Sequence, residues 1–226
     1  MRIFVCIALV LATLAAGPVL ADRIIFAPTG TTLSAGEVKA EAATSPSNDD
    51  SKIYWVGLGL QNFEVNAIRF DFKNDSPTVT KNRSRTIVNF DTSLDEEDYD
   101  IVNAQLGLIP ETTLTPAISI GTWDLTDKTA DGTGYFLAFS KAVPLTKELP
   151  LPVSDVKVHA GFGISGMDNI FGGAEASLPL GLKVSAEYFQ KDFNYALGWG
   201  PVAGLQLKAY ILDGETYYGL KFSSPL

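Results

Sequence analysis

The chain has 226 residues, a formal net charge of −9 and a hydrophobic fraction of 46%. The acidic balance argues against nucleic acid and against an anionic membrane surface as partners. Beyond the N-terminal region no apolar run is long enough for a membrane-spanning helix, which excludes multi-pass helical proteins.

Residues 1–21 have the features of a secretory signal peptide. Arg2 precedes an apolar run that ends in Val19-Leu20-Ala21, a small-residue cleavage pattern. Cys6 is the only cysteine, and it would be lost with this peptide. We therefore expect residues 22–226 to form a single β-barrel domain without disulfides.

The rest of the chain reads as β-strands separated by turns. Runs in which apolar and polar residues alternate recur along it, with turn residues such as Asp213-Gly214 between them. The candidate strands are 35–43, 52–61, 63–72, 83–92, 99–108, 115–125, 133–142, 155–164, 169–179, 182–190, 193–200, 203–211 and 215–222.

The number of candidate strands is odd, whereas single-chain bacterial barrels have even numbers of strands. Either one of the two least regular runs, 63–72 or 83–92, is not a strand, or Arg23–Ala27 adds another. We expect about 12 strands, with about 14 as the next possibility.

The alternation divides the side chains into two faces. Val158, Leu182 and Leu207 belong to an apolar face, and the opposite face is polar, charged and rich in glycine. If this polar face surrounds the inside of a barrel, the residues that line the lumen are Glu37, Lys39, Glu41, Arg83, Arg85, Asp91, Lys157, His159, Glu175, Lys183, Glu187 and Lys208. Their charges are mixed, so they could fill a narrow lumen with ion pairs or line a small polar pore.

The direction of the apolar face decides the class of protein. Strand lengths that match a tilted bilayer crossing and a meander of tight turns after residue 169 favour an apolar face in lipid. Aromatic residues at strand ends suggest an interfacial girdle: Trp123, Tyr135, Tyr188, Phe193 and Trp199. The sequence thus predicts an all-β, antiparallel, up-and-down transmembrane β-barrel, with a soluble secreted β-sandwich that acts as a binding protein as the alternative.

Residues 169–222 resemble the C-terminal repeats of YjbH-type outer-membrane β-barrel proteins, which are associated with exopolysaccharide production. The resemblance lies in Gly172-Gly173-Ala174-Glu175, in Gly181-Leu182-Lys183 leading to Ala186-Glu187-Tyr188, and in Asn194, which opens the next strand. It implies a bacterial outer-membrane location, contact with outer-membrane lipid, and polysaccharide or export-machinery proteins as partners.

No motif for catalysis, a cofactor or a metal stands out. The glycines of Gly161-Phe-Gly163-Ile-Ser-Gly166 match a dinucleotide-binding pattern, but a strand and not a helix follows them, so packing explains them better. His159 shares the phase of Lys157, and no serine of a recognisable motif accompanies it. The acidic run 95–98 lacks the spacing of a calcium loop.

These observations predict a non-enzymatic protein. We expect a structural or accessory component of the envelope or of exopolysaccharide export, and the alternative within the same fold is a small passive pore for polar solutes.

Overall fold

The computed structural model describes residues 23–46, 51–71, 98–145, 153–167, 170–212 and 214–225. Its strands are β1 Glu37–Thr44, β2 Lys52–Leu60, β3 Phe63–Asp71, β4 Asp98–Ile109, β5 Ala117–Trp123, β6 Gly134–Val143, β7 Asp155–Ser165, β8 Ile170–Ser177, β9 Leu182–Phe189, β10 Asp192–Val202, β11 Leu205–Leu212 and β12 Glu215–Pro225. A short 3₁₀ turn, η2 Pro179–Gly181, lies between β8 and β9.

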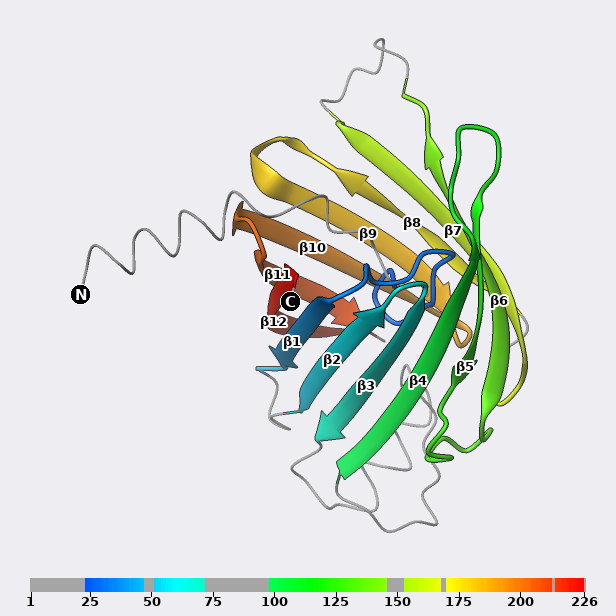
Figure 1. Cartoon of the computed structure of the whole chain (residues 1–226). Coiled ribbons are helices and arrows are strands. Elements are labelled where there is room, and N and C mark those ends of the chain that lie inside the picture. Colours follow the sequence, from blue (N-terminus) through cyan, green and yellow to red (C-terminus); the bar gives the residue numbers. More distant parts are fainter. Residues whose placement is uncertain are drawn as a thin grey trace.

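The strands form a closed antiparallel barrel in which each strand pairs with its neighbours in the sequence (Figure 1). The ring closes where β1 pairs with β12, with Glu37 opposite Pro225 and Thr44 opposite Tyr218. Closure removes both free edges of the sheet, so the pairing of every strand is satisfied within the chain. The predicted all-β up-and-down barrel of 12 strands is confirmed, and the β-sandwich alternative is wrong.

The odd strand count has a simple resolution. The candidate strand 63–72 is β3, whereas 83–92 lies outside the described residues. Arg23–Ala27 adds no strand to the wall, because Arg23 makes only an isolated bridge with Pro28. The barrel therefore has an even number of strands, and it begins and ends at the same end of the ring.

The apolar face of the strands points outward. Val158 and Leu207 are 42% and 46% exposed on the outer wall, and Leu182 shares their phase. Lys157, Lys183 and Lys208, their neighbours in sequence, therefore face the lumen, because successive side chains of a strand alternate between its faces.

Four of the five residues of the expected aromatic girdle, Tyr135, Tyr188, Phe193 and Trp199, lie on the outer face. Trp123 was expected among them, but it is 2% exposed and packs inside the barrel, edge to face on Phe189 with ring centroids 5.1 Å apart. Its place on β5 explains the difference, since Ala117, Ser119 and Trp123 share the buried phase of that strand.

Within the ranges that the structure describes, no helix is long and apolar enough to cross a bilayer.

Candidate functional site

The lumen of the barrel contains the segment that precedes β1. We call residues 23–36 the N-terminal plug. In Figure 1 it is the blue segment inside the ring of strands. Residues 24–30 and Leu33 are buried, and they contact side chains from strands on opposite sides of the wall. The plug therefore supplies part of the core of the barrel.

A tight turn in the plug is held by the carboxylate of Glu187 on β9. Ile24 N–H donates to the carbonyl of Ala27 at 3.1 Å, which closes the turn. Within it, the backbone N–H groups of Ile25, Phe26 and Ala27 all donate to Glu187, at 2.9 to 3.1 Å. Successive N–H groups that converge on one anion form a favourable site for negative charge, so this turn and this carboxylate match each other.

Further along the plug, polar side chains of the wall bind its backbone. Gln105 Nε2 and Ser119 Oγ both donate to the carbonyl of Thr29, at 2.7 Å each. Gly30 N–H donates to Ser140 Oγ at 2.7 Å. These contacts come from β4, β5 and β6, three to five strands around the ring from the β9 strand of Glu187. Leu33 N–H donates to Glu64 on β3, the strand opposite β9, so the plug bridges the lumen.

The plug also approaches the wall too closely for larger residues. A Cβ atom at Gly30 would lie 2.4 Å from the carbonyl oxygen of Ala117 and 2.6 Å from the backbone nitrogen of Ser140. A Cβ atom at Gly59 on β2 would lie 2.1 Å from the carbonyl oxygen of Ser34. The lumenal glycine at position 59 therefore makes room for the plug.

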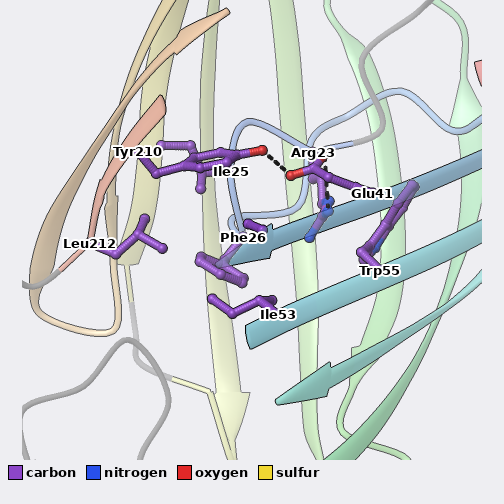
Figure 2. A pocket seen from close by; sticks show the side chains of 9 residues that line it. Arg23, Ile25, Phe26, Glu41, Ile53, Trp55, Tyr210 and Leu212 are labelled. Carbon is purple, nitrogen blue, oxygen red and sulfur yellow. Dashed lines mark hydrogen bonds and ion pairs between the residues drawn. The ribbon is translucent and has the colours of Figure 1, made fainter. Parts of the chain in front are cut away.

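A cluster of charged and aromatic side chains surrounds the start of the plug (Figure 2). Glu41 lies 3.8 Å from Arg23 and 3.2 Å from Lys208, and it accepts a hydrogen bond from the hydroxyl of Tyr210. The guanidinium of Arg23 lies 4.1 Å from the ring centroid of Trp55, within the range of a cation–π contact. Glu41 is thus the common partner of two cations in this cluster.

Small cavities lie beside the plug. One, of about 10 Å³, is lined by residues of Figure 2, and another, of about 20 Å³, lies between Phe26, Asn103 and Trp123. Each has room for about one water molecule, because a single water needs roughly 10–15 Å³ of accessible volume. The lumen of a twelve-strand barrel is too wide for the side chains of the wall alone to fill. Here the plug occupies the remaining space.

Of the predicted lumenal residues, nine are described, and all of them lie on the inner face. They are Glu37, Lys39, Glu41, Lys157, His159, Glu175, Lys183, Glu187 and Lys208. Arg83, Arg85 and Asp91 lie outside the described residues.

The charges of the lumenal side chains are mostly paired. Lys39 lies 3.9 Å from Glu37, Lys183 lies 2.5 Å from Glu175, and Lys157 reaches Glu111 of the β4–β5 connection at 3.5 Å. Glu187 differs from the others, because all of the partners described for it are neutral hydrogen-bond donors, three of them in the plug.

His159 has a serine partner that the sequence did not reveal. Its Nδ1 lies 2.7 Å from Ser140 Oγ, and its Nε2 lies 3.6 Å from the carboxylate of Glu175. Serine, histidine and an acid in contact are the components of a catalytic triad. Here Ser140 and His159 are buried, and Gly30 of the plug donates a hydrogen bond to the hydroxyl of Ser140, so the plug covers this hydroxyl in the described structure.

The glycines of the dinucleotide-like pattern have packing roles. A Cβ atom at Gly161 would lie 2.2 Å from the ring of Phe171, and one at Gly166 would lie 1.6 Å from the carbonyl oxygen of Gly132. Among the described residues, no group of three or more His, Cys, Asp or Glu side chains could hold a metal ion. Asp98 apart, the acidic run 95–98 lies outside those residues.

The plug was not predicted from the sequence. Ile24-Ile25-Phe26-Ala27 is uniformly apolar, which fits neither a strand with one polar face nor an exposed linker. The one signal was the number of glycines on the lumenal face, since a polar lumen lined by water has no need of a close backbone approach.

The chain matches no protein-family model, and no curated protein matches it. Among solved structures it is similar to a KdgM porin, with 7% sequence identity and a TM-score of 0.47 over 84% of this chain and 99% of that chain. It is also similar to the COG4313 outer membrane channel from Pseudomonas putida F1, with 10% identity and a TM-score of 0.41 over 86% of this chain and 97% of that chain. Neither comparison confirms the resemblance to YjbH-type proteins.

Proposed function

We propose that the chain is a bacterial outer-membrane β-barrel in contact with lipid. The support comes from the outer wall. In the described strands, every charged side chain on that wall lies within two residues of a strand end, as Lys52, Arg69, Asp98 and Lys141 do. The middle of the wall is apolar throughout, as a hydrocarbon core requires.

We propose further that the end of the barrel that carries the first residue of β1 and the last of β12 faces the periplasm. Two-residue turns occur at both ends: between β2 and β3 and between β10 and β11 at this end, and between β9 and β10 and between β11 and β12 at the other. The longest connection, 72–97, joins β3 and β4 at the other end. Short periplasmic turns and longer external loops are the usual arrangement in outer-membrane barrels.

Within this setting we propose a structural or accessory role, with the barrel closed at rest. The observation that carries this proposal is the plug, which is buried in the lumen and hydrogen-bonded to the wall through Glu187, Gln105 and Ser140, with cavities of about 10 and about 20 Å³ beside it. A passive pore needs a continuous aqueous path, and the described lumen holds a packed core in its place. The resemblance to YjbH-type proteins directs this role toward exopolysaccharide export, with export-machinery proteins or polysaccharide as partners.

Planar bilayers test the closed state. Purified full-length protein that runs folded on unboiled gels should insert and give no steady single-channel current. Steady current steps from the wild-type protein under these conditions would instead establish the open passive pore and contradict the accessory role.

A second candidate is a pore for small polar solutes that conducts when the plug leaves. It is favoured by the chemistry of the lumenal wall: Gln105, Ser119, Ser140, Glu64 and Glu187 are all polar groups that water could solvate in place of the plug backbone. Current that appears only when the plug is disturbed would favour this candidate over the accessory role.

We propose that the protein is not an enzyme and that Ser140 serves the plug. Its hydroxyl accepts the hydrogen bond from Gly30, where a substrate would otherwise have to approach. A fluorophosphonate probe, which labels activated serines, should leave the full-length protein unlabelled. Labelling that disappears in Ser140→Ala would overturn this assignment.

A further inference from the structure

The wall of the lumen recognises the plug chiefly through its backbone. Five side chains, Glu187, Gln105, Ser119, Ser140 and Glu64, contact N–H or carbonyl groups between Ile25 and Leu33. Glu187 and Glu64 accept from N–H groups, while Gln105 and Ser119 donate to carbonyls. Such contacts depend on the backbone conformation of a bound peptide more than on its side chains.

Three side chains of the plug add specific contacts. Arg23 lies between the ring of Trp55 and the carboxylate of Glu41. Phe26 stacks on Phe70, with ring centroids 6.0 Å apart and an interplanar angle of 24°. Leu33 is fully buried, beside the glycines of β2. Buried aromatic and arginine side chains are the residues that most often dominate the affinity of a peptide for its site.

The charges of the plug and of its site are complementary. Arg23 is the only charged residue in the plug sequence RIIFAPTGTTLSAG. The side chains of the wall that contact the plug include four carboxylates, those of Glu37, Glu41, Glu64 and Glu187. An acidic peptide would place its charges against these groups, so the site favours a cationic ligand.

We propose that the lumen is a peptide-binding site, and that it binds in trans a basic-aromatic peptide, with a tight turn followed by an extended stretch, when its own plug is displaced. The ligand carries an arginine three residues before a phenylalanine, as the plug does. This inference rests on the geometry of the plug and not on the membrane location or the accessory role. It assigns to the lumen a ligand class that neither a passive pore nor a structural barrel requires.

A full-length variant with a weakened plug and an unchanged wall provides the test. Arg23→Glu with Phe26→Ala removes two plug side chains and leaves Glu187, Gln105, Ser119 and Ser140 in place. A fluorescent synthetic peptide of residues 23–36 is added in detergent, and its anisotropy reports binding. The variant should bind the peptide at least tenfold more tightly than the wild type, whose tethered plug competes at an effective concentration of the order of millimolar.

Two controls make the result specific to this site. A peptide that carries the same Glu and Ala replacements should bind at least tenfold more weakly than the wild-type peptide. Adding Glu187→Gln to the variant chain should also weaken binding at least tenfold, because the turn loses its carboxylate.

Binding of both peptides alike, or no binding by a variant that still runs folded on unboiled gels, would overturn the proposal. If the double variant does not fold, Phe26→Ala alone is used in the same assay with the same criteria. Single-channel current from the wild-type barrel would contradict the accessory role but would not change the outcome of the peptide-binding assay. Failure of the accessory role and failure of the peptide-binding proposal can therefore be told apart.

Discussion

The carboxylate of Glu187 accepts hydrogen bonds from the backbone N–H of Phe26 at 3.0 and 3.1 Å, across 161 residues of sequence. Glu187 belongs to the wall and Phe26 to the plug, so this contact attaches the plug to the wall of the barrel. Asn194 Nδ2 donates to the same carboxylate at 3.0 Å from the adjacent strand β10, which fixes its orientation.

Replacing Glu187 with glutamine should loosen the turn of the plug. The amide has one acceptor oxygen where the carboxylate has two, and its NH₂ group would face N–H donors at Ile25 to Ala27. A buried donor left without a partner costs about 1–3 kcal/mol. Amide hydrogen exchange over residues 24–27, followed by mass spectrometry, should therefore speed up about tenfold or more.

The matched control for this variant is Glu215→Gln. Glu215 also lies on the inner face, at the start of β12, and its described hydrogen bond is with Tyr217 rather than with the plug. Exchange over residues 24–27 should be unchanged in this control. Equal exchange in both variants would mean that Glu187 does not hold the turn.

Gly30→Ala should displace the plug and open the lumen. The added Cβ atom would overlap the backbone of Ala117 and Ser140, at 2.4 and 2.6 Å, and backbone atoms of a paired strand cannot move aside cheaply. Overpacking of this kind costs about 1–3 kcal/mol. We expect current steps in planar bilayers that the wild type does not give.

Gly107→Ala is the control, because a Cβ atom there would meet its nearest neighbour, the carbonyl oxygen of Asn62, at an ordinary 3.5 Å. It should remain silent in the same experiment. A folded Gly30→Ala protein that also gives no current would show that the close contact of Gly30 with the wall is not what prevents conduction.

The pair of Arg23 and Glu41 in Figure 2, together with the neighbouring Lys208, predicts an asymmetry between the charges of this cluster. Glu41→Gln leaves Arg23 and Lys208 near each other without a carboxylate, whereas Lys208→Gln leaves Glu41 still paired with Arg23. Breaking a buried ion pair by removing one partner costs about 3–5 kcal/mol. The side chains of Glu41, Arg23 and Lys208 are 11–12% exposed, so Glu41→Gln should lie near the lower end of this range and Lys208→Gln below it. Urea unfolding followed by gel mobility measures both.

The exposed pair of Arg69 and Asp100 serves as the comparison. Its two hydrogen bonds are 2.8 Å long, but both side chains are about half exposed at one end of the barrel. Water and salt screen such pairs, so Asp100→Asn should leave the unfolding midpoint unchanged. A larger effect for Asp100→Asn than for Glu41→Gln would contradict the importance assigned to burial.

The sequence predicted the wall well because its evidence is local. Alternation of Lys157 with Val158, or of Lys208 with Leu207, determines which side chains share a face, and the number of alternating runs brought the expected strand count close to the observed one. Local alternation does not reveal what fills the enclosed space. Trp123 shows this limit, since an aromatic residue at a strand end suits both a girdle and a packed lumen.

The plug could not be predicted because alternation along a strand is local, whereas the contacts of the plug are not. Its contacts join residues far apart in the sequence, as Gly30 with Ser140 and Leu33 with Glu64 do, and a single sequence carries no periodic signal for them. Ser140 and His159 are 19 residues apart, on β6 and β7, and they meet only because those strands pair in the register that places Ser140 opposite His159.

Leu197→Lys tests whether the outer wall contacts lipid. Leu197 lies in the middle of β10 and is 48% exposed on the outer face. A lysine at the midplane of a bilayer destabilises an outer-membrane barrel by about 2–4 kcal/mol, whereas in water it would be tolerated. The folded fraction in lipid vesicles, read from gel mobility without boiling, should fall for this variant.

The control is Leu114→Lys, in the β4–β5 connection and 91% exposed, which should fold like the wild type. Equal folding of both variants in vesicles would contradict the lipid-facing wall and with it the outer-membrane location.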